Sequence, residues 1–270
     1  MRKQLEKCKQ LALLCSALLL VTACESDRSD VLSQVETGTD LLLFDNSAIT
    51  PGGQMTLVWS DEFDGSGLDP ATWLTRNGDG SEVGLPGGWG NNELQYYQPD
   101  NVEVANGLLV ITAREESVGG LNYTSARITT ADRVAFRYGR IEARMRLPGG
   151  QGVWPAFWLL SQNSPYGSWA AVGEIDVMEA INLGVGGLNE VFGTIHFGGE
   201  FPENQFTSQT QVVATSATDE FHTYALEWDP TEMRWYVDGV LYRMENSWFS
   251  TAAPYPAPFD QAFRIIFNVA

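Results

Sequence analysis

The sequence is poor in cysteine and in basic charge, and it lacks the motifs of the common cofactor chemistries. All three cysteines, Cys8, Cys15 and Cys24, lie near the N-terminus, so the rest of the chain can form no disulfide. The formal net charge of -18 argues against nucleic acid or an anionic membrane surface as a partner, but not against a neutral polymer. There is no Gly-x-Ser-x-Gly elbow, dinucleotide loop or phosphate loop. Two scattered histidines, His196 and His222, with no cysteine nearby predict no zinc site and no required cofactor.

What the chain does contain is typical of one β-rich globular domain. Its 270 residues are 44% hydrophobic and 11% aromatic, enough for one sizeable core. No stretch has a sustained helical period. Asn106-Gly107 and Asp238-Gly239 each separate two apolar runs, which predicts two β-hairpins. Many further short strands favour two packed antiparallel sheets; they are predicted at 125–129, 139–147, 156–160, 173–180, 190–197, 221–228 and 263–269.

The N-terminal segment predicts export. A basic start precedes an apolar run, 11–23, that is too short for a comfortable transmembrane helix. The run ends in Leu20-Val21-Thr22-Ala23-Cys24, which resembles the lipobox of bacterial lipoproteins and implies cleavage before Cys24 and acylation of its thiol. A plain signal peptide with an accidental cysteine is the alternative. We therefore predict a leader over 1–23, a tether over 24–55 and one domain over 56–270, with the apolar patch 41–44 as an extra edge strand.

The acidic stretch 173–180 is the main candidate for chemistry. In a strand, Glu174 and Asp176 share one face, and a β-bulge at Val177-Met178 returns Glu179 to that face. In a helix, Glu174 and Glu179 would lie about 140° apart. Paired carboxyl groups are what a retaining glycosidase needs as nucleophile and acid/base. A merely solvated acidic face is the alternative that this stretch alone leaves open.

Aromatic residues surround this stretch. Trp154 and Trp158 precede it at a spacing that puts them on one face of a regular strand, and Trp169 lies just upstream. Large rings mostly fill cores, but their flat faces also serve as platforms for sugar rings. His196 likewise fits either the core or a substrate groove, whereas His222 is predicted to be structural.

Together the motifs resemble glycoside hydrolase family 16, in its laminarinase (endo-β-1,3-glucanase) branch. The acidic stretch is similar to the family's Glu-x-Asp-x-x-Glu signature, and further blocks follow in the family's order across residues 56–270. These blocks are Leu57-Val58-Trp59-Ser60-Asp61-Glu62-Phe63-Asp64-Gly65, Trp89-Gly90-Asn91-Asn92-Glu93-Leu94-Gln95-Tyr96-Tyr97, Tyr138-Gly139-Arg140-Ile141-Glu142-Ala143-Arg144, Gly152-Val153-Trp154-Pro155-Ala156-Phe157-Trp158 and Gly193-Thr194-Ile195-His196. The acidic motif alone is a weak signal, whereas the ordered set is specific.

The resemblance implies an all-β fold, a two-sheet antiparallel jelly-roll sandwich (concanavalin A-like) with a substrate groove on the concave sheet. It implies retaining double displacement, with Glu174 as nucleophile, Glu179 as acid/base and Asp176 tuning their ionisation. It also implies a set of residues that contact substrate, which comprises Asn91, Arg127, Trp154, Trp158, Trp169 and His196.

The end of the chain departs from the family pattern. The segment 262–270 resembles a strand near the family's end, and the Gly-rich loop and last strand that the resemblance implies do not follow it. In the family, that last strand often supplies an aspartate to a structural calcium site, which also uses the residue matching Glu62. We therefore expect a sheet that lacks its last strand, which puts a metal-ligand role for Glu62 in doubt.

The leading functional prediction is an exported, membrane-tethered, monomeric enzyme that hydrolyses β-1,3 or β-1,3-1,4 glucans such as laminarin. It would be lipid-anchored at the outer membrane or cell surface, or otherwise secreted. Two alternatives remain: a non-catalytic β-glucan-binding lipoprotein that uses the same groove, and the same enzyme fold acting on a galactan such as agar. The presence of all three acids favours the enzyme.

Overall fold

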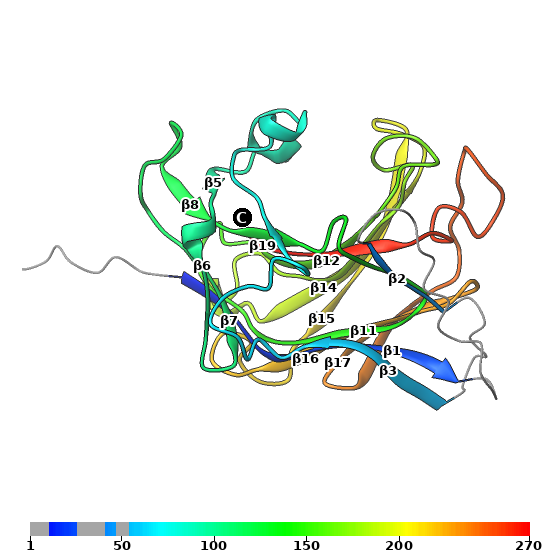
Figure 1. Ribbon diagram of the computed structural model, residues 1–270, viewed down its shortest axis with the longest axis horizontal. Helices are drawn as coiled ribbons and strands as arrows, with labels where there is room; N and C mark the ends of the chain where they lie inside the picture. The colour runs from blue at the N-terminus through cyan, green and yellow to red at the C-terminus, as the bar shows by residue number, and fades with distance from the viewer. Residues whose placement is uncertain (1–10, 26–40, 47–53) are drawn as a thin grey trace, which may run out of the picture.

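Two β-sheets packed face to face make up most of the molecule in the computed structural model (Figure 1). The structure describes residues 11–25, 41–46 and 54–270, and for 11–25 it describes the backbone only. The fold is the two-sheet jelly-roll sandwich that the sequence predicts, with strands joined by loops and short 3-10 turns. Within the described ranges, no helix has the length and apolar character needed to cross a membrane.

Sheet A is built from antiparallel strands. They are β1 (Leu11–Glu25), β3 (Gln54–Asp61), β6 (Val102–Ala105), β7 (Leu108–Ala113), β11 (Gly139–Arg146), β16 (His222–Trp228), β17 (Met233–Val237) and β18 (Val240–Glu245). Their spatial order is β18-β17-β16-β11-β1-β7-β6, with β3 also paired to β1.

Sheet B carries the acidic strand in its middle. Its strands are β2 (Leu42–Asp45), β4 (Leu74–Thr75), β9 (Arg127–Thr129), β10 (Val134–Arg137), β12 (Pro155–Ser161), β13 (Glu174–Glu179), β14 (Glu190–Gly198), β15 (Asn204–Val212) and β19 (Phe263–Val269). The order is β15-β14-β13-β12-β19-β10-β2, with β9 paired to β19 and β4 to β9. Outside both sheets, β5 (Gln95–Tyr97) pairs with β8 (Tyr123–Ser125), and the 3-10 turns are η1 (Ser81–Val83), η2 (Gly88–Gly90), η3 (Pro99–Asn101) and η4 (Val185–Gly187).

Both predicted hairpins are confirmed. Asn106 and Gly107, with φ of 56° and 70°, connect β6 to β7, and Asp238 and Gly239, with φ of 50° and 76°, connect β17 to β18. Positive φ at both central residues is the turn type whose twist matches that of the flanking strands. The sequence gives no sign of β15, because its side chains are mostly polar on both faces. Among the described strands, β15 pairs with β14 alone.

The core lies between the inner faces of the two sheets. Phe157 of β12 and Phe267 of β19 stack with ring centroids 4.7 Å apart, and Trp228 and Trp235 of sheet A are buried with them in one hydrophobic cluster. Each such side chain contributes about 1.5–3 kcal/mol or more by leaving water. Because strand residues alternate between faces, this packing leaves the other residues of β12, β13 and β19 on the outer face of sheet B.

Strand β1 is the main departure from the sequence-based expectation. It pairs with β11 on one side and with β7 and β3 on the other, so residues 11–25 lie inside a sheet and not outside the fold. The reason is that an unbroken apolar run suits a paired strand as well as a leader, because neither requires a polar face. Cleavage before Cys24 is a processing step that the fold does not test, so the leader over 1–23 stays a prediction.

The predicted tether over 24–55 also contains paired segments. Strand β2 pairs in parallel with β10 at the edge of sheet B, where Arg137 forms an ion pair with Asp45 and Phe44 stacks on Phe136 at 5.4 Å. The apolar patch 41–44 is therefore the extra edge strand that the sequence suggested. The remainder of the predicted tether, 26–40 and 47–53, lies outside the described residues.

Candidate active site

The acidic strand β13 contains the predicted bulge. On the neighbouring strand β12, Trp158 pairs with Asp176 and Phe157 pairs with Met178, so Val177 is the extra residue. The pairing of β13 with β14 shifts by one residue in the same interval. Val177 and Met178 are both buried in the core. The bulge therefore restores the parity of the strand and places Glu174, Asp176 and Glu179 together on the outer face of sheet B.

The opposite sheet holds this bulge in place. A bulge interrupts the ladder of backbone hydrogen bonds, so a carbonyl beside it needs another donor. Trp235 of β17 supplies one, because its Nε1–H donates to the backbone oxygen of Asp176 at 2.9 Å. The indole can approach because Gly193 of β14 has no side chain: a Cβ there would lie 2.5 Å from Cδ1 of Trp235.

Cross-strand pairing extends three rows of residues from the acids over the outer face of sheet B. The rows are Phe206–His196–Glu174–Leu160–Arg264, Ser208–Thr194–Asp176–Trp158–Ile266 and Thr210–Phe192–Glu179–Ala156–Asn268–Arg127. Directly paired residues stand on the same face of a sheet. The acids thus have strands on both sides, which we call the β14–β15 arm and the β12–β9 arm (β12, β19 and β9). In Figure 1, the turn between β14 and β15 and the segments β5 and β8 rise above sheet B at opposite ends of the view.

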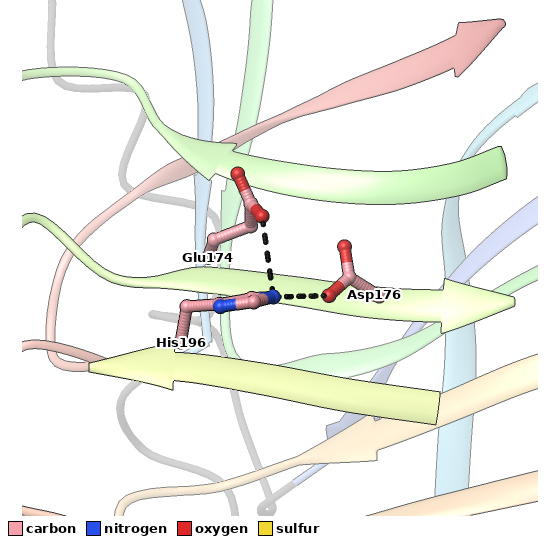
Figure 2. Close-up of side chains that lie close together, drawn as sticks. All are labelled: Glu174, Asp176 and His196. Atoms are coloured by element: carbon pink, nitrogen blue, oxygen red, sulfur yellow. Dashed lines mark ion pairs between the residues drawn. The ribbon is translucent and has the colours of Figure 1, made fainter. Parts of the chain in front are cut away.

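Glu174 contacts an indole and an imidazole. The Nε1–H of Trp169 donates to Oε2 of Glu174 at 3.2 Å, and Nε2 of His196 lies 3.7 Å from Oε1. The same Nε2 lies 3.4 Å from Oδ2 of Asp176, so the imidazole faces two carboxyl groups at once (Figure 2). The ring centroids of Trp169 and His196 are 5.5 Å apart. These contacts rule out the core placement that the sequence left open for His196.

Glu179 and Asp176 have different partners. The Nε1–H of Trp154 donates to Oε1 of Glu179 at 2.8 Å, so each glutamate accepts a hydrogen bond from its own indole. Asp176 is only 3% exposed, and its Oδ2 has no hydrogen-bond partner in the part of the chain that the structure describes. A buried carboxyl oxygen without a donor disfavours the charged form.

Burial raises the pKa of Glu174, Asp176 and Glu179 to about 8 each. Desolvation is the largest cause for all three, and the charge of Asp176 raises the pKa of both glutamates further. The positive charge of Arg127 and a protonated His196 act in the opposite direction on Glu174. Carboxyl groups this close share their protons. At neutral pH the site therefore retains acid protons, which general acid chemistry needs.

On the β12–β9 arm, two indoles enclose a cation. The guanidinium carbon of Arg127 lies 4.4 Å from the ring centroid of Trp89 and 4.6 Å from that of Trp158. Trp158 is fixed in turn, because its Nε1–H donates to Oδ1 of Asn268 at 2.7 Å. Burial lowers the pKa of Arg127, which nevertheless stays charged. A desolvated cation–π contact contributes about 2 kcal/mol, so this stack is a rigid part of the face.

Most of the predicted groove residues meet at this face. Those on it, beside the acids or on the neighbouring strands, are Trp154, Trp158, Trp169, His196 and Arg127. Asn91 forms no hydrogen bond with the acids in the described part of the chain. It is exposed after η2, where its Nδ2 donates to Oε1 of Glu93 at 3.4 Å. The loop of Asn91 reaches the face through Trp89, which stacks on Arg127, and a substrate contact of the Asn91 amide stays a prediction.

Sequence reasoning missed Asn268 and Phe206. Asn268 is 6% exposed and orients Trp158, and the alternation of β19 places it on the outer face, a signal that was present in the sequence. Phe206 is 64% exposed, with its ring centroid 5.7 Å from that of His196. It sits in the polar strand β15, and no sequence pattern marks that strand.

Possible metal ligands among the described side chains gather at the acids and not at Glu62. Glu174, Asp176 and His196 offer three ligand atoms that all lie within 4.8 Å of one another, and Glu62 belongs to no such group of the described residues. Asp61, beside Glu62, already accepts hydrogen bonds from Phe63 and Trp73. These side chains do not by themselves make up the oxygen shell of calcium, and calcium binding stays a prediction.

A family model, Glycosyl hydrolases family 16, matches residues 90–269. The chain therefore belongs to glycosyl hydrolase family 16. Similar proteins include the glucan endo-1,3-beta-glucosidase A1 of Niallia circulans, 41% identical over 232 residues (80% of this chain, 34% of the relative), and the beta-glucanase of Rhodothermus marinus, 41% identical over 252 residues (90% and 84%). The chain thus spans about a third of the first relative's length. The laminarinase catalytic domain from Thermotoga maritima MSB8 superposes with a TM-score of 0.69 at 38% identity, covering 80% of this chain and 86% of that one.

Proposed function

We propose that this chain is a retaining endo-β-1,3-glucanase that acts on polymers such as laminarin. The observation that carries the proposal is the bulged strand β13, which places two glutamates and an aspartate on one face of sheet B. Membership of glycosyl hydrolase family 16 and 41% identity to two glucanases support the substrate class.

Glu174 and Glu179 divide the chemistry. A carboxylate oxygen of Glu174 attacks the anomeric carbon while Glu179 donates its proton to the glycosidic oxygen, and the bond between that carbon and that oxygen breaks. The leaving chain departs as an alcohol, and the remaining chain is held as an ester of Glu174. Water then gives a proton to Glu179 as its oxygen attacks the anomeric carbon, which releases Glu174. Burial raises the pKa of Glu174, whereas the positive charges of a protonated His196 and of Arg127 favour the ionised form that a nucleophile requires.

Burial keeps the acid protonated, because it raises the pKa of Glu179 more than any other effect does. Asp176, placed between the two glutamates, raises that pKa further when it is itself ionised. The hydrogen bond from Trp154 opposes this effect on Glu179 and also fixes the direction of the carboxyl group. Asp176 therefore acts on the reaction through its neighbours.

The positions of the two glutamates also set the path of the polymer. A retaining glycosidase has its two carboxyl groups on either side of the bond to be broken. A glucan chain between Glu174 and Glu179 must therefore cross β13, and it then extends over the β14–β15 arm in one direction and the β12–β9 arm in the other.

Replacing Glu174 with Gln tests the mechanism. We expect release of reducing ends from laminarin to be lost while binding of laminari-oligosaccharides persists, because Gln keeps the shape of the side chain but cannot attack. Glu103→Gln, at an exposed position of sheet A, is the matched control and should keep full activity. Unchanged turnover by Glu174→Gln would contradict the mechanism.

The substrate is tested with the wild-type chain. Products from laminarin, lichenan and agarose distinguish a β-1,3-glucanase from an enzyme for mixed-linkage glucan or for a galactan. Binding of laminarin without any hydrolysis would instead favour a glucan-binding lipoprotein.

We also propose that residues 1–23 are a lipoprotein leader, that Cys24 is acylated, and that the exported enzyme works as a lipid-anchored monomer. The basic start, the apolar run and Leu20-Val21-Thr22-Ala23-Cys24 support this proposal. Cleavage before Cys24 would remove most of β1 and leave β11, β7 and β3 without that partner. Processing of a lipoprotein would therefore remove residues that pair within sheet A in this fold. Palmitate labelling and a globomycin-sensitive precursor test it; no label incorporation would leave an unanchored protein.

A further inference from the structure

We propose that Glu174, Asp176 and His196 bind one divalent transition-metal ion of the zinc class, and that the bound ion excludes glucan from the site. The exclusion rests on the proposed glucanase function, whereas the metal binding does not. The sequence predicts no such site because His196 is distant from both acids along the chain. Strand pairing brings it directly opposite Glu174.

Two of the three donor–donor separations are already close to those of a tetrahedral site, and the three donor atoms all lie within 4.8 Å of one another. Zinc binds imidazole nitrogen and carboxylate oxygen at about 2.0–2.2 Å, which places neighbouring donors of a tetrahedron about 3.3–3.5 Å apart. Nε2 of His196 lies 3.4 Å from Oδ2 of Asp176 and 3.7 Å from Oε1 of Glu174. Figure 2 shows both carboxyl groups turned toward this nitrogen.

An independent observation points to a missing ligand at this place. Asp176 is 3% exposed, and Oδ2, the oxygen that faces His196, has no hydrogen-bond partner among the described residues. A buried carboxylate oxygen in this state carries a desolvation penalty that no hydrogen bond from the described residues compensates. A cation bound between Asp176 and His196 would compensate it.

The surrounding contacts hold the three side chains ready. Trp169 donates to Oε2 of Glu174, which leaves Oε1 as the oxygen nearest His196. The Nε1–H of Trp235 donates a hydrogen bond to the backbone carbonyl of Asp176 and so fixes the backbone there. A site whose ligands are held by neighbouring strands and indoles loses little conformational entropy when the ion binds.

The same geometry limits the affinity. Three protein ligands leave one tetrahedral position open, as in catalytic zinc sites. Metal-binding histidines usually donate from their other ring nitrogen, yet Nδ1 of His196 is buried without a partner in the described structure. Because such support changes affinity by about 10–100-fold, we expect moderate and reversible binding. Since Glu174 is also the proposed nucleophile, a bound ion and a glucan cannot occupy the site together.

Calorimetric titration with Zn²⁺ tests the site directly. All variants carry serine in place of Cys8, Cys15 and Cys24, because thiolates are themselves zinc ligands. We expect one Zn²⁺ per chain, and a tetrahedral visible spectrum when Co²⁺ replaces it. His196→Gln should weaken binding by about tenfold or more. His222→Gln is the matched control and should bind as tightly as the parent, because His222 lies in sheet A with Nδ1 on Asp238 at 2.7 Å.

The outcomes separate the metal site from the enzyme. Absence of binding, or equal binding by the parent and His196→Gln, overturns the metal site and indicates adventitious binding to an acidic surface. Binding that depends on His196 in a chain that hydrolyses no glucan supports the metal site and overturns only the proposed function. In an active chain, Zn²⁺ should raise KM for laminarin and leave kcat unchanged; inhibition that lowers kcat alone overturns the exclusion of glucan.

Discussion

The two arms of sheet B present aromatic rings to the outer face in different ways. On the β12–β9 arm, Arg127 is enclosed between Trp89 and Trp158, and Asn268 fixes the indole of Trp158. On the side of the β14–β15 arm the rings are more exposed: Phe206 of β15 is 64% exposed, and Trp169, from the loop before β13, is 39% exposed. Trp169 and Phe206 both pack against His196, at 5.5 Å and 5.7 Å between ring centroids.

This difference indicates a division of labour along the polymer. The β12–β9 arm, in which the indoles stack on Arg127, keeps its rings and charge fixed before any ligand arrives, which favours recognition of one sugar ring in one orientation. The β14–β15 arm offers apolar surface with few polar contacts, which favours weak contact with sugar rings in many orientations. Replacing a residue of the β12–β9 arm should therefore change both stability and affinity, whereas replacing a residue of the β14–β15 arm should change mainly KM for long substrates. Replacing one of the acids between them should leave the structure of both arms intact.

The largest effect is expected for Glu179→Gln, between the arms. Loss of the general acid should lower kcat/KM on laminarin about 10²–10⁴-fold. Affinity for laminari-oligosaccharides, measured by calorimetry, should stay within a small factor because both arms are intact. With a substrate whose leaving group needs no protonation, the Glu179→Gln variant should again carry out the first step, the formation of the ester with Glu174. A loss of less than tenfold on laminarin would assign the acid role to another residue.

Asp176→Asn should change the pH dependence of stability. Burial raises the pKa of Asp176 to about 8, so the folded state holds this proton more tightly than the unfolded chain does. The stabilisation from this proton is full below about pH 4 and is lost as pH rises through about 8. Because Asn cannot ionise, the Tm of the variant relative to wild type should rise with pH, by the equivalent of a few kcal/mol. Thermal unfolding at about pH 5 and about pH 9 measures it, with Glu103→Gln as control; a difference that does not vary with pH would contradict the burial argument.

The sequence predicts the acids better than it predicts the arms. Period-two alternation and one bulge are enough to put Glu174, Asp176 and Glu179 on one face, and the family motif gives their order. The cation–π stack cannot be predicted from a local sequence pattern, because it joins three segments that are distant along the chain, those of Trp89, Arg127 and Trp158.

The support beneath the site is equally hidden in the sequence. Trp235 reaches the bulge from the opposite sheet through the space that Gly193 leaves, and neither residue carries a local signal of this contact. For the N-terminal apolar run the local signal is clear but has two interpretations. A leader and the paired strand β1 require the same apolar residues, so the sequence alone does not distinguish them.

Arg127→Met should lower stability and affinity together. The side chain is similar in length but has no charge, so both indole contacts lose their cation–π component, which amounts to about 1–3 kcal/mol in total. We expect a lower Tm, and a higher KM for laminarin and for short oligosaccharides alike, because the rings of the β12–β9 arm lose their fixed spacing. Arg114→Met, at a partly exposed surface ion pair with Glu116, is the control and should change stability by no more than about 0.5 kcal/mol. An unchanged Tm for Arg127→Met would mean that the stack does not rigidify its arm.

The smallest effect, and the sharpest test of the difference between the arms, is expected for Phe206→Ala. Because this ring is 64% exposed, its removal should change the free energy of unfolding by no more than about 0.5 kcal/mol. KM for laminarin should rise a few-fold, while oligosaccharides too short to reach β15 should be unaffected, since only a chain that crosses β14 meets the ring. Val240→Ala, equally exposed at 64% on sheet A, controls for loss of an apolar surface side chain. A fall in Tm as large as that of Arg127→Met would show that both arms are rigid. An unchanged KM for long and short substrates alike would show that the polymer does not cross β13, because a chain running along that strand would not reach β15 at any length.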